Sequence, residues 1–148
     1  MVERLHLDQF LPYLLSVTSN RVSARIAGAY EALFGLSIPE WRLVTLIAEH
    51  APVTQAQLCE RSRMDKVTVS RAAISLTERG LLVRTPNATD RRSHHLRLSA
   101  EGEALYAQVA PQANALERRI FGRFDARELA QFTDMLRRID AAAAEEED

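Results

Sequence analysis

Residues 54–99, which decide the fold, read TQAQLCERSRMDKVTVSRAAISLTERGLLVRTPNATDRRSHHLRLS. Thr54 opens a capping box, so we expect a short helix from there to about Arg61. Asp65 is a preferred N-cap residue, and the helix that it begins is expected to reach Arg79. Two helices joined by a three-residue turn have the spacing of a helix-turn-helix motif.

After this helix pair, the apolar pattern changes to that of two short strands. We expect the strands at residues 81–85 and 95–98. The intervening residues 86–93 are rich in turn formers, so they predict a hairpin with a polar tip. A short helix pair followed by a hairpin is a winged helix-turn-helix. We place this domain at residues 36–99, with the wing at about 82–98.

Upstream, the spacing of apolar residues predicts one long helix. Its apolar face is expected to consist of Leu15, Val22, Ile26, Ala29 and Leu33. The helix should start at roughly Asp8 or Pro12, because proline is tolerated only in the first turn. It should reach Phe34 and end at Gly35.

A second capping box connects this helix to the helix-turn-helix. Ser37 is the expected N-cap and Glu40 its partner, for a helix that runs to about His50. Leu36 and Trp41 flank this cap at the positions of a hydrophobic staple.

Two more helices are predicted downstream. Ser99 is the expected cap of a helix that reaches about Phe121 and is bent at Pro111. Another helix is expected from near Asp125 to Ala143.

The long helices at the two ends of the chain predict a dimer. Residues 1–35 and 100–143 carry more apolar surface than a domain of this size covers by itself, and a partner subunit is the natural place for it. The acidic residues 144–148 are expected to be a disordered tail. The predicted fold class is therefore mainly α with a small β-hairpin wing: a winged helix-turn-helix with long N- and C-terminal dimerisation helices.

Composition excludes several classes of protein. The chain has 148 residues, of which 47% are hydrophobic, and this is typical of one globular domain with extensions. A single cysteine excludes an internal disulfide framework and a Cys-cluster zinc site. No apolar run is long enough to span a membrane, and no signal peptide is visible, so we expect a soluble, cytoplasmic protein.

Positive charge is concentrated in one part of the chain. The net charge is −1, yet nine basic and only three acidic residues lie between Arg61 and Ser99. A basic block inside an acidic chain is typical of a localised polyanion site. A solvated basic face is the alternative interpretation.

Four strings in this order resemble the MarR family of multiple-antibiotic-resistance regulators: MDKVTVSR (64–71), ERGLL (78–82), DRR (90–92) and LRLS (96–99). The resemblance covers nearly the whole chain and is strongest over residues 54–102. It implies an obligate dimer that binds a pseudo-palindromic operator in double-stranded DNA. It also implies that a small aromatic or phenolic compound commonly releases the DNA.

The helix that begins at Asp65 is then the candidate recognition helix. We expect Val69, Ala73 and Leu76 to form its buried side. The residues left available to the major groove are Lys66, Thr68, Ser70, Arg71 and Ser75. Hydroxyl groups can bond phosphates, and Lys and Arg can reach guanine O6 and N7. A solvated helix face is the alternative.

Asp90-Arg91-Arg92 resembles the Asp-x-Arg wing motif of the family, which assigns Arg92 to the minor groove. Asp90 would orient the wing-tip arginine through a charge-assisted hydrogen bond, and Arg91 would contact phosphate. Asp90 could instead close an Asx turn, and both roles can hold together.

The effector site is less well marked. The family pocket lies between the first, second and fifth helices, and for it we nominate Tyr13, Trp41 and Arg42. Trp41 is equally explained by the staple, and Tyr13 by dimer packing.

We expect no cofactor and no metal. His94 and His95 are adjacent in a strand and so point to opposite faces. Cys59 is interpreted as a partly buried apolar residue.

The sequence therefore predicts a homodimeric, ligand-responsive repressor. A repressor without a ligand, or a redox switch, is the alternative within that class. A winged-helix protein–protein interaction module is the alternative from another class. An enzyme is the weakest alternative, because no nucleophile–base string or Gly-rich phosphate loop is present.

Overall fold

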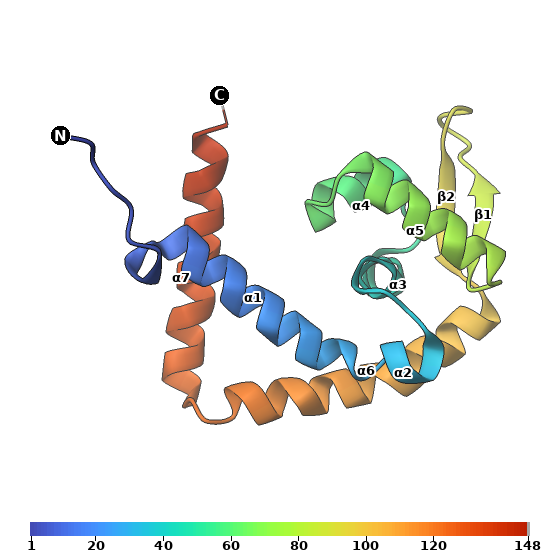
Figure 1. The fold of residues 1–148 in the computed structure, drawn as a ribbon. Coiled ribbons are helices and arrows are strands. Elements are labelled where there is room, and N and C mark those ends of the chain that lie inside the picture. The colour runs from blue at the N-terminus through green and yellow to red at the C-terminus, as the bar shows by residue number, and fades with distance from the viewer. Residues whose placement is uncertain (148) are drawn as a thin grey trace. The chain divides into compact units, whose positions relative to one another are not determined.

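The computed structural model describes residues 1–147 and is mainly helical, with one two-stranded antiparallel sheet (Figure 1). In chain order, the elements are η1 (Leu7–Gln9), α1 (Leu11–Ala27), α2 (Glu31–Phe34), α3 (Ile38–His50), α4 (Gln55–Ser62), α5 (Lys66–Glu78), β1 (Leu82–Pro86), β2 (His94–Leu98), α6 (Ala100–Phe121) and α7 (Ala126–Glu145). The chain divides into two compact units, residues 1–113 and 114–148. The predicted fold class is confirmed.

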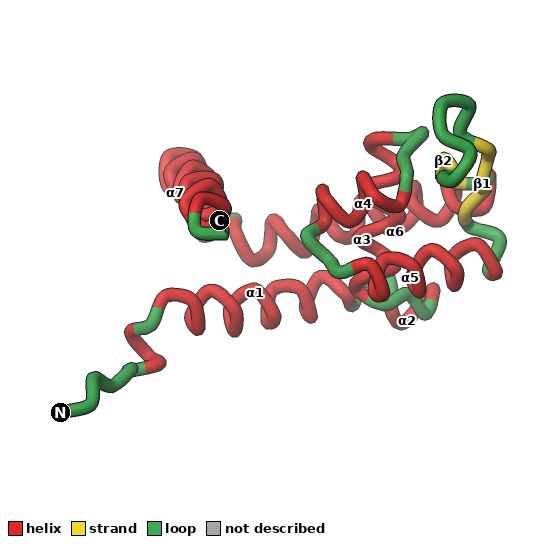
Figure 2. The backbone as a smooth tube through the Cα atoms, turned by 90° about the horizontal axis from the view of Figure 1, so that it is seen from above, coloured by secondary structure: helices red, strands yellow, loops and turns green. Residues whose placement is uncertain are grey.

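The winged helix-turn-helix lies in the first unit, where α3, α4 and α5 gather beside the hairpin (Figure 2). Strands β1 and β2 pair from Leu82 opposite Leu98 to Pro86 opposite His94. Val53, just before α4, exchanges two backbone hydrogen bonds with Leu96 of β2, of 3.3 and 2.7 Å. The wing is therefore joined to the helices through the backbone as well as through side chains.

The caps that were predicted around this domain are confirmed. Ser37 with Glu40, and Thr54 with Gln57, each form a reciprocal capping box. Asp65 caps α5 by accepting a hydrogen bond from the backbone N–H of Thr68. Side-chain oxygens thus satisfy backbone donors at the starts of α3, α4 and α5, and these caps fix where the three helices begin.

The core lies between these helices and the wing. Along α5, the buried residues are Val69, Ala72, Ala73 and Leu76, which confirms the buried side that was predicted. Leu58 of α4 and Leu96 of β2 are both at most 1% exposed. Burial of one face of α5 leaves its opposite face to solvent.

The single long N-terminal helix was a wrong prediction. Helix α1 ends at Ala27, and the chain turns before the short α2. Ala29 and Tyr30 at this turn are each 2% exposed, and the Tyr30 ring stacks on Trp41 at 5.3 Å. The apolar spacing of a helix continues through the turn, so the sequence pattern did not reveal it. Gly35 ends α2 with a left-handed φ of +63°, as expected.

The C-terminal boundary also needs correction. Helix α7 continues to Glu145, two residues beyond the predicted end at Ala143, and residues 146–147 form a turn. Residues 144–145, predicted as the start of a disordered tail, therefore belong to α7. Disorder of residues 146–147 stays a prediction, and residue 148 lies outside the described part. Pro111 lies inside α6. None of the helices within residues 1–147 is both long and apolar enough to cross a membrane.

Gly102 allows α6 to approach the base of the wing. A Cβ at this position would overlap the backbone carbonyl oxygen of Leu81 and lie 3.3 Å from the Cβ of Leu98. The hydroxyl of Ser99 accepts the N–H of Gly102 at 3.1 Å, which fixes the first turn of α6 at this contact.

We predict that Gly102→Ala lowers the free energy of unfolding by about 1–3 kcal/mol, because overpacking against backbone outweighs the better helix propensity of alanine. Urea denaturation measures this change. Gln108→Ala, at an exposed position of the same helix, is the control and should stay within about 0.5 kcal/mol of wild type. Equal stability of both variants would contradict the close approach.

Candidate nucleic-acid interface

The start of α5 is rigidly built and carries exposed charge. The Asp65 carboxylate accepts the N–H of Thr68 at 2.8 Å and its hydroxyl at 3.0 Å, and these hydrogen bonds lower the pKa of Asp65. Lys66 and Arg71 are exposed, whereas Thr68 and Ser70 are half-buried. The two cations and the Ser70 hydroxyl are thus available near the beginning of the helix, whereas the hydroxyl hydrogen of Thr68 is used by Asp65.

Ser75 of α5 makes a hydrogen bond to a carboxylate on another helix. Its hydroxyl donates to Glu40 Oε2 at 2.8 Å, across 35 residues of sequence. The other oxygen of that carboxylate accepts the backbone N–H of Ser37 at 2.9 Å. The hydroxyl hydrogen of Ser75 therefore already serves the fold, and its contact with DNA stays a prediction.

The ionised state of Glu40 is favoured by its surroundings. Burial by itself raises the pKa of this carboxyl, but the hydrogen bonds from Ser37 and Ser75, together with the charge of Arg79, outweigh it. The net pKa lies below the usual value, so Glu40 is an anion at neutral pH.

Side chains of the wing organise its tip. Asp90 Oδ1 accepts the backbone N–H of Arg92 at 2.9 Å, which is an Asx turn. Asn87 accepts the N–H of Thr89 at 3.1 Å and donates to Ser93 at 3.0 Å. These bonds give a long loop a defined shape.

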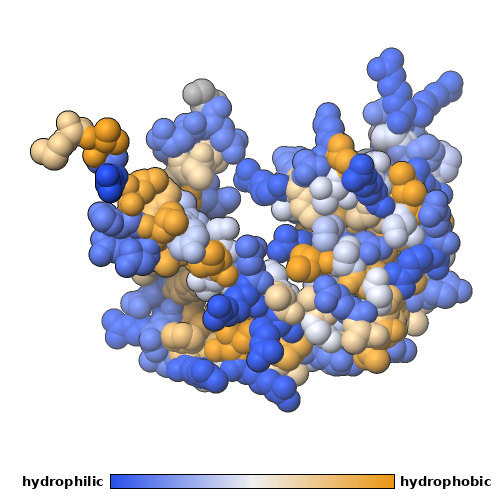
Figure 3. Space-filling model, viewed as in Figure 1, coloured by the Kyte–Doolittle hydropathy of each residue, from blue (hydrophilic) through white to orange (hydrophobic). Residues whose placement is uncertain are grey.

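Arg91 and Arg92 are both exposed on this ordered tip, which is hydrophilic in the space-filling view (Figure 3). In residues 1–147, the hydrogen bond recorded for Asp90 with an arginine goes to the backbone of Arg92. The Asx-turn interpretation of Asp90 is thus the one for which there is a contact. Its charge-assisted bond to a guanidinium stays a prediction.

The three residues nominated for an effector lie in different environments. Trp41 is 8% exposed and is stacked between Tyr30 at 5.3 Å and Tyr106 at 6.0 Å. Tyr13 on α1 is 41% exposed, and Arg42 is exposed on α3. The aromatic cluster around Trp41 is therefore made by two tyrosines that were not nominated.

A helical pattern could have pointed to one of these tyrosines. Gly102, Leu105 and Val109 are the buried residues of α6, and Tyr106 is four residues after Gly102 on the same side. The signal for Tyr30 would have been the turn between α1 and α2, which the apolar spacing did not reveal. Desolvation raises the pKa of Tyr30, Glu31 raises it further, and the positive charge of Arg42 lowers it, so the cation lies close enough to act on the cluster.

The part of the chain that the structure describes was predicted to bind no metal. In the described residues, no three His, Cys, Asp or Glu side chains gather closely enough to hold a metal ion. Cys59 is half-buried on α4 and is a free thiol.

Comparisons with known proteins agree with this geometry. The sequence model of the MarR family matches residues 34–93. Transcriptional regulator HosA of Escherichia coli O157:H7 is 28% identical over 104 residues, or 70% of this chain and 77% of that protein. The homoprotocatechuate degradative operon repressor of Escherichia coli is 27% identical over 101 residues, 68% of each chain.

A solved structure extends the likeness to most of the chain. CouR from Rhodococcus jostii RHA1, bound to p-coumaroyl-CoA, superposes with a TM-score of 0.80 at 26% identity, covering 92% of this chain and 95% of that one. The family match covers the helix-turn-helix and most of the wing, including the exposed cations of α5 and the two exposed wing arginines. Over residues 34–93 in sequence, and over most of its fold, the chain is similar to the MarR family of winged helix-turn-helix transcriptional regulators.

Proposed function

We propose that the protein is a homodimeric, sequence-specific repressor of a pseudo-palindromic operator, and that a small aromatic ligand releases it from double-stranded DNA. One observation carries the proposal: the recognition helix and the wing of one domain both present unburied cations. These are Lys66, Arg71, Arg91 and Arg92. With DNA as its partner, the protein would act in the cytoplasm as a binding protein and not as an enzyme.

Helix α5 is suited to the major groove. Val69, Ala72, Ala73 and Leu76 turn one side of the helix to the core, so the side with Lys66, Ser70 and Arg71 remains for base edges and phosphates. The wing is suited to a minor groove, whose negative potential attracts an inserted arginine such as Arg92.

Two copies are needed to read a pseudo-palindrome, and each unit offers a surface for a second copy. In α7, Phe132, Met135, Leu136 and Ile139 are 40–53% exposed, although all are large and apolar. Leu11, Leu14 and Leu15 on α1 are also exposed. Figure 3 shows apolar side chains along this N-terminal part of the surface. Burial of such faces in a dimer would supply the hydrophobic free energy that a single chain leaves unused.

The aromatic ligand is proposed from the relatives and from the cluster at Trp41. CouR is bound to p-coumaroyl-CoA, and one relative represses a homoprotocatechuate degradative operon. Tyr13, Trp41 and Arg42 stay our nominated contacts. Because Trp41 is packed between two tyrosines, a ring compound would have to lie at the edge of the stack or open it. Such a ligand shifts the protein only by its different affinity for the DNA-bound and released states.

Titration with DNA tests the proposed function. The purified protein is titrated with DNA from upstream of its own gene and with a scrambled duplex, at several salt concentrations. Tighter binding to the first duplex with a steep salt slope is expected. Failure to bind any duplex at low salt would overturn the proposal and favour a protein–protein interaction module.

We predict that Arg92→Ala weakens operator binding by at least ~1 kcal/mol at fixed salt, because the wing loses its minor-groove cation. Fluorescence anisotropy with a labelled operator measures the loss. Arg138→Ala, on α7, is the matched control and should leave the affinity unchanged. Unchanged affinity in Arg92→Ala would contradict the assignment of the wing.

Alanine substitutions at Ser70 and Ser75 should have different effects on stability and on operator binding. Ser75→Ala removes the bond to Glu40 and is expected to lower the free energy of unfolding by about 1 kcal/mol. Ser70→Ala should leave stability within about 0.5 kcal/mol of wild type and weaken operator binding. Thermal unfolding and anisotropy are measured for both variants. The opposite pattern would show that Ser75, and not Ser70, serves DNA.

Leu136→Asp is expected to raise the dissociation constant of the dimer by roughly 30-fold or more, because it places a carboxylate in the apolar α7 surface. Size-exclusion chromatography with light scattering over a range of concentrations measures this constant. Arg137→Asp introduces the same carboxylate at the neighbouring exposed position and is the control. If Leu136→Asp stays as dimeric as wild type, α7 is not in the interface.

A further inference from the structure

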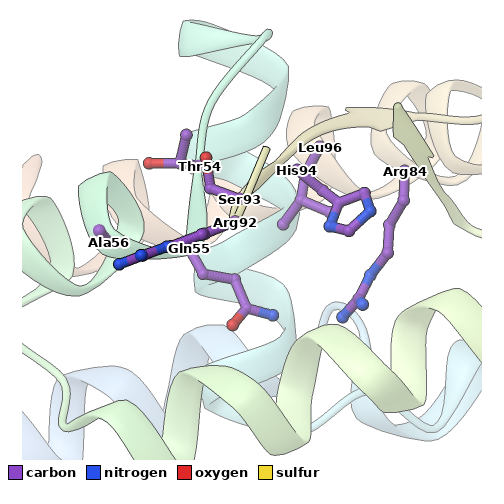
Figure 4. A pocket seen from close by; sticks show the side chains of 8 residues that line it. All are labelled: Thr54, Gln55, Ala56, Arg84, Arg92, Ser93, His94 and Leu96. Carbon is purple, nitrogen blue, oxygen red and sulfur yellow. The ribbon is translucent and has the colours of Figure 1, made fainter. Parts of the chain in front are cut away.

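A pocket of about 270 Å³ lies between the start of α4 and the base of the wing (Figure 4). It is lined by Thr54, Gln55, Ala56, Arg84, Arg92, Ser93, His94 and Leu96. We refer to it as the wing-base pocket. Figure 4 shows Gln55 and Ala56 on its helix side, and Arg84 and His94 on its strand side.

The register of the hairpin explains why these strand residues reach the pocket. Arg84 of β1 pairs with Leu96 of β2, so both point to the same face of the sheet. Leu96 is 1% exposed, which identifies this face as the one packed on the helices. His94 is two residues before Leu96 and lies on the same face. Arg97 directly follows Leu96 in β2, so it points to the opposite face.

The lining is rich in positive charge and hydrogen-bond donors. Two guanidinium groups and one imidazole reach the pocket, and none of its eight lining residues is acidic. In residues 1–147, no ion pair is recorded for Arg84 or Arg92. Within the described residues, no recorded ion pair therefore neutralises the charge of these two guanidinium groups.

The hydroxyl groups of the pocket also remain able to donate. Thr54 Oγ1 accepts the backbone N–H of Gln57 at 3.2 Å, and Ser93 Oγ accepts the side-chain amide of Asn87 at 3.0 Å. In each case the oxygen serves as the acceptor, so its own hydrogen is left for another partner.

Helix α4 adds two backbone donors. The first N–H groups of a helix have no intrahelical carbonyl partner, and the capping box uses those of Thr54 and Gln57. The N–H groups of Gln55 and Ala56 remain, at the positive end of the helix dipole. A guanidinium group close to the positive N-terminus of α4 is electrostatically unfavourable, unless an anion lies between the guanidinium and the helix.

We propose that the wing-base pocket holds a phosphate group of the DNA backbone, bound by Arg84, His94 and the N–H groups of Gln55 and Ala56. The proposal rests on the function proposed above. Arg92 links the pocket to the proposed DNA binding. An arginine that is inserted into a minor groove lies between two phosphate backbones, so a phosphate comes next to the base of the same wing. Arg84 then contributes to the affinity for DNA and to the position of the wing along the duplex, but it does not distinguish one base from another.

Arg84→Gln is the test variant, because Arg84 is exposed and lines the pocket, yet has no assigned role at base edges. We expect it to weaken binding roughly tenfold at low salt, by the same factor for operator and scrambled duplex. The slope of log affinity against log salt should become shallower by about 0.9, as for the loss of one phosphate contact. Thermal unfolding checks that the variant is folded.

Arg97→Gln is the matched control. It removes the same charge from the same hairpin, but from the face that points away from the pocket. Its salt slope should equal that of wild type. A slope that is unchanged in Arg84→Gln, or reduced equally in both variants, would overturn the proposal. Wild-type operator binding in the same series reports separately on the proposed function.

Chemical modification of the DNA distinguishes a backbone phosphate from a free one. Single methylphosphonates, which remove the charge of one phosphate, are scanned through the operator. Wild type should lose affinity at one position in each half-site, whereas Arg84→Gln should lose none there. In parallel, inorganic phosphate is titrated into the DNA-free protein, and the amide NMR signals of Gln55 and Ala56 are followed. Saturation at submillimolar phosphate without a sensitive methylphosphonate position would assign a free anion and overturn the DNA assignment.

Discussion

The carboxylate of Glu40 joins helix α5 to the start of helix α3. One of its oxygens closes the capping box of α3, and the other accepts the hydroxyl of Ser75 in the middle of α5. Next to it, Arg79 at the end of α5 donates to the backbone carbonyl of Phe34. A single anion therefore joins the start of one helix to the face of another, and the exposed side of α5 is directed by a contact on its inner side.

The wing is held in a comparable way, through backbone contacts on two sides. Val53 pairs with Leu96, while Gly102 lets α6 lie against the carbonyl of Leu81. Both contacts involve main-chain atoms: the first joins β2 to the residue just before the N-cap of α4, and the second joins the base of the hairpin to α6. Strand β1 brings Arg84 to the start of α4, and the wing tip is a loop stabilised by its own side-chain and backbone hydrogen bonds.

An aromatic cluster connects the remaining parts of the first unit. Trp41 of α3 lies between Tyr30, at the turn before α2, and Tyr106 of α6. Any movement of these segments must be accommodated by stacked rings that come from three separate stretches of the chain. A compound that entered this cluster would thus act on α3 and, through Glu40, on α5. This is the route by which the proposed aromatic ligand would reach the proposed DNA-binding helix.

The sequence by itself determined the elements whose signals are local. Capping boxes at Ser37 and Thr54, the N-cap at Asp65 and the turn formers of the wing each act within a few residues, so the helix-turn-helix and hairpin followed from them. Tertiary structure alone decided what depends on distant partners. The Tyr30 ring at the break between α1 and α2 packs on Trp41, and the hydroxyl of Ser75 bonds a carboxylate 35 residues away. Local spacing specifies which face of a helix is apolar, but burial against the rest of the chain decides which polar groups stay available to DNA.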